Sequence, residues 1–435
     1  MSVGRKIAVK KELYVKAPDK YTCDMRIQQY TEPYGFKRVE KRSIQKESDF
    51  INELYERYSE DNGKTWSDWR DVYKNALEVK KNGDEIIWCE GNEYFNPVYN
   101  HFVSLSMQRI FSGNHKEAYN ILWSKGEKSF ADHTFITIRE VGSDLKKSNL
   151  IKYHKNVDYN TEDWSNKEYF NNNESYLGTN IDVLKNGDII FPIAANIKAC
   201  CNILGINYID EFPPYYYQLM KGLIIIKGKW DKEERKYNLT FSKPIIINDL
   251  KSSRGVDEPL AIQLKSGRII SIFRGSNMKS DNWKTRIEEG TPCHKWFCYS
   301  DDNGKTFTDP VPWHFDDREV IYSSASYSQI FRSIKNGRIY WIGNITDYEA
   351  YCNYPRYPLN IVEIDEGSGL PKKASNTIID TRDPEKDSDK LQLSNFSIIQ
   401  DRDTQQIEIY LVKYGQRENY TYWADCYRYF VELSE

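Results

Sequence analysis

The stretch VLKNGDII at residues 183–190 decides the fold, because close copies of it recur along the chain. The copies read VKKNGDEII at 79–87, QLKSGRII at 263–270 and SIKNGRIY at 333–340. Each copy passes through Asn-Gly or Ser-Gly and ends in β-branched or aromatic residues. Since glycine accepts the positive φ of a tight turn, each copy predicts a β-hairpin.

Four copies of one hairpin indicate a supersecondary unit that the chain uses repeatedly, and a looser copy follows at 397–410. Helical periodicity is scarce, and its best example, 117–125, is interpreted as a short surface insertion. Radially arranged blades of four strands fit this spacing. We therefore expect an all-β fold, a six-bladed β-propeller forming a single domain over 1–435, with blades at about 25–66, 79–140, 179–230, 257–307, 327–365 and 394–433.

Three further stretches complete this organisation. The N-terminal stretch 7–15 is expected to add the fourth strand of the last blade and to close the ring, which removes exposed sheet edges. The stretches 141–178 and 205–220 are polar or proline-containing and are interpreted as long insertions between strands.

Composition restricts the possible partners. The 435 residues include 61 basic and 64 acidic side chains, so the net charge of −3 gives no overall attraction to nucleic acid. A mean hydropathy of −0.73 and the absence of a long apolar run argue against a membrane protein. Aromatic residues make up 14% of the chain, which suits both strand packing and the stacking of sugar rings. We expect a carbohydrate partner, no nucleic acid and no membrane, and the oligomeric state stays open.

Cysteine and histidine usage predicts neither a metal nor another cofactor. The eight cysteines form no CxxC pair, and the six histidines show no metal-ligand spacing, so we expect reduced, mostly buried thiols. The N-terminal residues lack the apolar core of a signal peptide. This predicts a cytoplasmic protein, or a secreted one whose leader is missing from the sequence.

Two segments share a sharper motif, SEDNGKTW at 59–66 and SDDNGKTF at 300–307. The aspartate accepts hydrogen bonds from its own turn, the glycine takes the left-handed conformation, and the aromatic residue packs between sheets. Turn chemistry explains every position, so we expect these residues to hold the fold and not to form a site. The residues concerned are Asp61, Gly63, Trp66, Asp302, Gly304 and Phe307.

This motif resembles the Asp-box, or BNR repeat, of the sialidase (neuraminidase) superfamily, and a degenerate third copy lies at 364–369. The resemblance implies the six-bladed sialidase-like propeller and a glycoside hydrolase of exo-α-sialidase type acting on a terminal acidic sugar. Retaining sialidases use three arginines that clamp the substrate carboxylate, an acid/base Asp, a Tyr nucleophile and a Glu that takes the Tyr proton. A neutral Tyr avoids the repulsion that an anionic nucleophile would meet beside a carboxylate.

The segment 257–274 looks like the sialidase segment that carries the Glu and one clamp arginine. The resemblance therefore assigns these roles to Glu258 and Arg274. Met25-Arg26-Ile27 is similar to the Arg-Ile-Pro start of the first sialidase blade and makes Arg26 the first clamp, although Gln28 stands where the family has Pro. Arg356, which precedes the apolar stretch 359–364, resembles the third clamp.

Asp49 lies ten residues before the first motif, where the family has its acid/base Asp, and Glu53 is its rival. The nucleophile departs from the family pattern. The family's Tyr opens the first strand of the final blade, but the corresponding stretch 393–399 contains no Tyr. Tyr327 lies in a similar Tyr-Ser context, although one blade too early, and is our candidate nucleophile.

Two alternatives stay open. A hydrolase or lyase could act on another uronic-acid-containing polysaccharide, and a lyase would use His101 as its base. A glycan-binding propeller without catalysis would instead stack sugar on aromatic loops, for which the candidates are Tyr215–Tyr217, Trp283 and Trp313.

Overall fold

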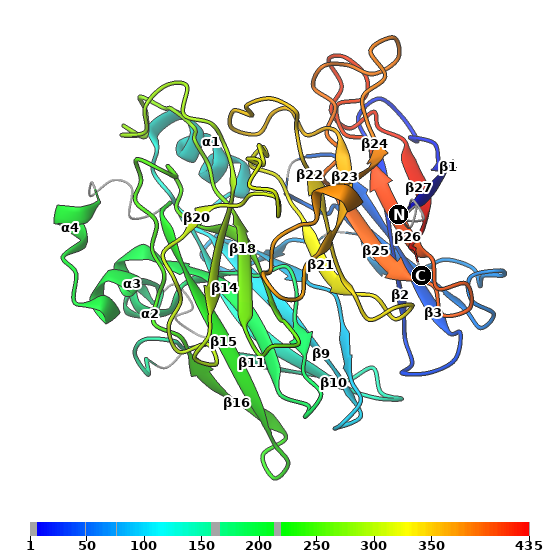
Figure 1. The fold of residues 1–435 in the computed structure, drawn as a ribbon, viewed down its shortest axis with the longest axis horizontal. Helices are drawn as coiled ribbons and strands as arrows, with labels where there is room; N and C mark the ends of the chain where they lie inside the picture. The colour runs from blue at the N-terminus through cyan, green and yellow to red at the C-terminus, as the bar shows by residue number, and fades with distance from the viewer. Residues whose placement is uncertain (1–6, 48, 75, 158–165, 213–218, 435) are drawn as a thin grey trace. The chain divides into compact units, whose positions relative to one another are not determined.

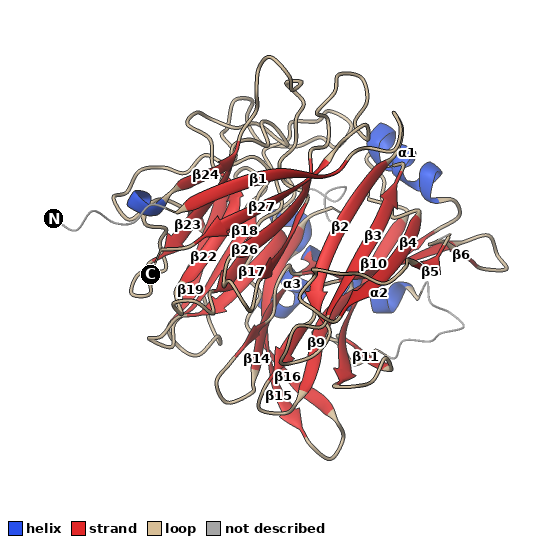
Figure 2. Cartoon of the chain, turned by 90° about the vertical axis from the view of Figure 1, so that its right-hand side faces the viewer, coloured by secondary structure: helices blue, strands red, loops and turns tan. Residues whose placement is uncertain are grey.

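The structure is a computed structural model that describes residues 7–47, 49–74, 76–157, 166–212 and 219–434. Strands dominate this part of the chain, and helices are few and short (Figure 1 and Figure 2). Six antiparallel sheets of four to six strands follow one another. The expected all-β, six-bladed propeller is therefore confirmed.

One compact unit consists of the described residues of Met1–Ala76 and His314–Glu435. It contains three four-stranded sheets, with the orders β2-β3-β4-β5, β21-β22-β23-β24 and β1-β27-β26-β25. Because β1 pairs antiparallel with β27, the beginning of the chain completes the sheet formed by its last strands (Figure 1). The strands are β1 Ala8–Val15, β2 Cys23–Tyr30, β3 Arg38–Gln45, β4 Glu53–Ser59, β5 Arg70–Tyr73, β21 Gln329–Arg332, β22 Ile339–Asn344, β23 Leu359–Ile364, β24 Thr377–Asp380, β25 Phe396–Gln400, β26 Ile407–Val412 and β27 Cys426–Glu432.

The second unit is Leu77–Trp313. Its sheets have the orders β11-β10-β9-β7-β6, with β8 on β9, then β12-β14-β15-β16, with β13 on β14, and β17-β18-β19-β20. The strands are β6 Glu78–Val79, β7 Glu85–Glu90, β8 Tyr94–Asn96, β9 His101–Phe111, β10 Phe130–Glu140, β11 Lys146–Leu150, β12 Ser175–Leu177, β13 Asp182–Val183, β14 Ile189–Asn196, β15 Lys221–Asp231, β16 Lys236–Phe241, β17 Asp257–Gln263, β18 Ile269–Arg274, β19 Lys295–Ser300 and β20 Val311–Pro312.

The four repeated sequence phrases form the hairpins that they predict. They join β6 to β7, β13 to β14, β17 to β18 and β21 to β22. In each turn the glycine has a φ between 70° and 91°. The turn at 184–188 is typical, since Gly187 N donates to Leu184 O at 2.9 Å and Leu184 N donates to Asp188 O at 2.8 Å. Local chemistry therefore fixes the pairing of these strands.

The two Ser-x-Asp-x-Gly-x-Thr turns connect β4 to β5 and β19 to β20. The Asp61 carboxylate accepts hydrogen bonds from Thr65 Oγ1 at 2.7 Å and Thr65 N at 2.8 Å. These bonds stabilise its charged form and lower the pKa of Asp61 to about 2. Asp302 makes the same bonds to Thr306, at 2.6 and 2.9 Å. Both aspartates thus hold their turns together.

Each unit has its own apolar core. In the first unit Ile342, Ile361 and Ile409 are buried together between neighbouring sheets. In the second unit all eight residues of β14 are buried. A strand packed on both faces is continuously apolar, and each fully buried isoleucine contributes about 2 kcal/mol to stability.

The α-helices of the described residues lie in the second unit and are α1 His115–Lys125, α2 Lys167–Asn173, α3 Ile197–Leu204 and α4 Tyr208–Glu211, and a short 3-10 helix, Lys373–Ser375, lies in the first. Helix α1 covers the insertion expected at 117–125. It begins at Asn114, whose side chain accepts hydrogen bonds from two backbone amides, and ends at the left-handed Gly126. Among the described helices, none has the length and apolarity that crossing a membrane requires.

Candidate functional site

In the first unit, Arg356 lies on the connection between β22 and β23. Its Nη1 donates to Gln392 Oε1 at 2.9 Å, and its Nη2 donates to the carbonyl oxygen of Ala325 at 3.0 Å. The peptide bonds before Pro355 and Pro358, on either side of it, are both cis. The guanidinium is therefore held against the segment that leads into β21.

Tyr327 lies on that same segment, two residues before β21. It is half-buried, and its ring packs edge-on against the ring of Phe396, with centroids 5.4 Å apart. Phe396 is the first residue of β25, the strand at which the family places its Tyr. Tyr327 therefore lies one blade earlier in the sequence than the family's Tyr, but its ring lies at the start of β25. Gln329 Nε2 donates a hydrogen bond to its hydroxyl oxygen.

The other two candidates of this unit have contrasting surroundings. Arg26, on β2, is buried, and its guanidinium makes two hydrogen bonds to Asp24, at 2.7 and 3.0 Å. Glu40 lies 3.6 Å away, so nearby carboxylates already balance the Arg26 charge. Asp49, between β3 and β4, is exposed and has a positive φ of 56°. Its rival Glu53 accepts a hydrogen bond from Tyr55 at 2.5 Å.

In the second unit, Glu258 and Arg274 lie at adjoining ends of β17 and β18. Arg274 Nη1 is 3.0 Å from Glu258 Oε2, and the two side chains are only 13% and 18% exposed. Glu258 has a positive φ of 43°, at an irregularity in the pairing of β17 with β18. The two residues that sequence similarity assigned to one site therefore form an ion pair.

Asp257, next to Glu258, is held by two cations. Its carboxylate lies 2.9 Å from Lys221 Nζ and 3.2 Å from Arg254 Nη2. Burial raises the pKa of Asp257, but Arg254, Lys221 and Arg274 outweigh it and leave that pKa below its usual value. Asp257 is thus ionised. It precedes Glu258 in the chain and pairs with Lys221, which lines a pocket.

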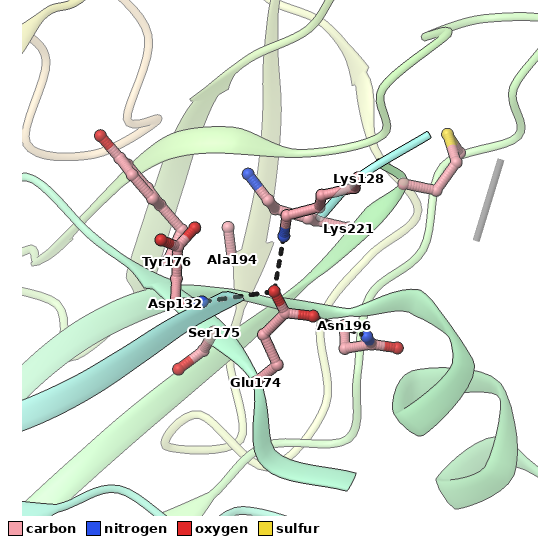
Figure 3. A pocket seen from close by; sticks show the side chains of 9 residues that line it. Lys128, Asp132, Glu174, Ser175, Tyr176, Ala194, Asn196 and Lys221 are labelled. Carbon is pink, nitrogen blue, oxygen red and sulfur yellow. Dashed lines mark hydrogen bonds and ion pairs between the residues drawn. The ribbon is translucent and has the colours of Figure 1, made fainter. Parts of the chain in front are cut away.

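Figure 3 shows this pocket. Its cavity volume is about 10 Å³, which is room for about one water-sized group. Glu174 lies in the pocket wall, 2.5 Å from Lys128 Nζ, and accepts a hydrogen bond from Asn196 Nδ2 at 3.0 Å. The lining residues are Lys128, Asp132, Glu174, Ser175, Tyr176, Ala194, Asn196, Met220 and Lys221. Sequence reasoning missed these residues.

His101, the alternative base, is fully buried at the start of β9. Its Nε2 lies 2.8 Å from the Tyr237 hydroxyl, and its ring packs on Trp230 with centroids 4.2 Å apart. Burial lowers the pKa of His101 to about 4, so it is neutral at pH 7. Its surroundings are those of a packed aromatic side chain.

The aromatic residues expected to stack sugar are arranged differently from the prediction. Trp313 has no exposed surface, and Trp283 is 4% exposed, which corrects their assignment to an open platform. Tyr215–Tyr217 lie outside the described residues. Sequence reasoning missed Tyr348, Tyr351 and Tyr354, which are 58%, 44% and 43% exposed near Arg356.

Metal binding has no candidate in the described part of the chain, where no three His, Cys, Asp or Glu side chains are grouped as ligands. The charged residues described above are suited to acid, base and ion-pair chemistry, and we assign no cofactor to them.

Comparison with known proteins gives a likeness of fold. No family model and no curated protein sequence matches the chain. Among solved structures, a protein of unknown function from Dyadobacter fermentans has a TM-score of 0.57 at 12% identity, covering 98% of this chain and 99% of that one. A Hadza microbial sialidase has a TM-score of 0.53 at 12% identity, covering 96% of this chain and 67% of that one.

A third similar structure is an α-L-arabinanase from Penicillium chrysogenum complexed with arabinobiose, with a TM-score of 0.48 at 9% identity, covering 98% of both chains. The chain is thus a six-bladed β-propeller, and its structural neighbours include a sialidase. At these identities the likeness concerns the fold.

Proposed function

We propose that this chain is a sialidase-like glycoside hydrolase that releases a terminal acidic sugar from a glycan. The observation that supports this most is the arrangement of Tyr327, Phe396 and Arg356. The Tyr327 ring lies at the start of β25, the strand at which sialidases carry their nucleophile. Arg356 donates to the carbonyl oxygen of Ala325, two residues before Tyr327. The two Asp-box-like turns and the likeness to a sialidase fold agree with this reading.

The proposed reaction uses the groups in the roles that the resemblance implies. The Tyr327 oxygen forms a bond to the anomeric carbon while the glycosidic bond breaks, and Asp49 gives its proton to the leaving oxygen. The Tyr327 proton goes to a carboxylate base, the role that the resemblance gives to Glu258. Water then displaces Tyr327, Asp49 takes a proton from the water, and the carboxylate base returns its proton to the Tyr327 oxygen.

Local contacts suit Tyr327 to this role. The Gln329 amide donates to the phenol oxygen, and such a donor stabilises negative charge that develops there. Arg356 would bind the substrate carboxylate, because a guanidinium stays charged and offers two parallel N–H groups.

The test is the release of an aryl alcohol from an aryl sialoside. We expect turnover by the wild type, a loss of at least a thousandfold in kcat for Tyr327→Phe, and an unchanged rate for Tyr34→Phe, whose side chain is 71% exposed in the same unit. Arg356→Lys should raise KM, because lysine cannot bind a carboxylate in bidentate fashion. Equal activity of Tyr327→Phe and wild type would contradict the assignment.

A glycan-binding propeller without catalysis is the second candidate, and the exposed tyrosines favour it. Tyr351 and Tyr354 exchange backbone hydrogen bonds of 3.0 and 3.1 Å, so a small hairpin presents both rings. Gln392 bonds both the Tyr354 hydroxyl and Arg356, which ties the rings to a cation. Calorimetric binding of a glycan with no product after days would favour this function, whereas an unsaturated uronate, detected by its absorbance, would indicate a lyase.

A further inference from the structure

The pocket of the second unit differs from the proposed catalytic groups, because none of its lining residues belongs to them. It combines two amino groups, two carboxylates, an amide and an aromatic ring in a confined space. Figure 3 shows Lys128 above the Glu174 carboxylate, with Lys221 on the same side of the pocket. Small-molecule sites commonly combine a confined space with a few convergent polar groups.

Cations and carboxylates around the pocket are unequally matched. Lys221 and Arg254 share one carboxylate, that of Asp257. The neighbouring Lys128 faces Glu174, and the buried Asp132 is bound by Arg109 at 2.6 Å. A positive charge that shares its counter-ion in a buried place is costly, and a second anion beside it would lower that cost.

Lys221 is the cation placed to receive such an anion. Its side chain is 14% exposed, and its amino group lies 4.8 Å from the centre of the Tyr176 ring and within the pocket wall. Burial lowers the pKa of Lys221, and the Asp257 charge offsets only part of this effect. The Arg254 Nε–H is also buried and meets no hydrogen-bond acceptor among the described residues.

We propose that the pocket lined by Lys128, Lys221 and Tyr176 binds the carboxylate group of an acidic sugar. Lys221 contacts the carboxylate, Lys128 and Asn196 donate further hydrogen bonds, and Tyr176 covers one side. The cavity has room for about one water-sized group, so one carboxylate oxygen of the ligand enters it and the sugar ring stays outside. This proposal does not depend on the hydrolase function, and it applies equally to a propeller that binds glycans without cleaving them.

The test compares acids with their neutral counterparts by calorimetry at low salt. The probes are glucuronate against glucose, and N-acetylneuraminate against N-acetylmannosamine. We expect at least one acid to bind the wild type at least tenfold more tightly than its neutral counterpart. Lys221→Met should weaken this binding at least tenfold, and Lys251→Met, which changes an exposed lysine of the same unit, should leave it unchanged.

If Lys221→Met does not fold, as judged by circular dichroism, Lys128→Met replaces it with the same expectation. Equal binding of acid and neutral sugar by the wild type, or full binding by the folded lysine variants, would overturn the proposal. Aryl sialoside turnover reports separately on the proposed catalytic function. A protein inactive in that assay whose acid binding depends on Lys221 would retain this site and lose only the hydrolase assignment.

Discussion

Replacing His101 by phenylalanine should change how stability depends on pH. Asn96 Nδ2 donates to the Tyr237 oxygen at 2.7 Å, and the Tyr237 hydroxyl shares a hydrogen bond of 2.8 Å with His101 Nε2. The imidazole is fully buried among aromatic rings. A second proton on it would bury a charge there, which is costly.

The magnitude follows from the two pKa values of His101. The unfolded state takes up the proton near pH 6.5, whereas burial lowers the native pKa to about 4. The unfolded state therefore binds more protons between these values, so stability decreases as the pH falls through this window. Between pH 7 and pH 5, His101 alone should remove about 2 kcal/mol from the free energy of unfolding.

The assay is urea unfolding followed by tryptophan fluorescence at pH 7, 6 and 5. At pH 7 His101→Phe should be less stable than wild type by about 1 kcal/mol, because the hydrogen bond between His101 and Tyr237 is lost. Since phenylalanine does not titrate, this difference should disappear or reverse by pH 5. His133, buried in both proteins, contributes equally to both and cancels. Parallel pH profiles of the two proteins would refute the reasoning.

Two further predictions concern charge and backbone in the fold. Arg38 is 1% exposed and pairs with Asp401 and Glu408, so Arg38→Met should cost about 3–5 kcal/mol, whereas Arg70→Met, at an exposed pair, should cost under about 1 kcal/mol. Thermal unfolding measures both, and similar losses would contradict the burial argument. Gly255 has a φ of 66°, and a Cβ there would meet the Lys221 carbonyl oxygen at 2.2 Å. Gly255→Ala should therefore lower Tm more than Gly290→Ala, which has a similar φ but open space; equal shifts would show that only φ matters.

The strands could be predicted from the sequence where local chemistry decides them. The Asn-Gly and Ser-Gly sequences predict their hairpins because the turn forms from a glycine at positive φ and requires no contact with distant residues. Helix α3 escaped prediction, since Ile197–Leu204 is short, apolar and indistinguishable by periodicity from a buried strand. Its helical conformation depends on tertiary contacts, because Phe212 and Met220 pack with it in the core.

The site could be predicted less completely, because its residues come together only in the folded chain. Glu258 and Arg274 were found through similarity, and they adjoin across one hairpin. Lys221 and Asp257, or Lys128 and Glu174, lie on different strands or loops, and nothing in the sequence reveals their pairing. Trp313 was misjudged because a tryptophan in the proline- and aspartate-containing stretch 309–317 gives no sign that it is fully buried.

The pairing of β1 with β27 has a consequence for synthesis on the ribosome. Residues 8–15 leave the exit tunnel long before their partner strand 426–432 is translated. During that interval β1 is an unpaired strand that could associate with other nascent chains. Its central residues Lys10, Lys11 and Glu12 carry charges that oppose such association. These charges therefore reduce aggregation of β1 until β27 has been synthesised.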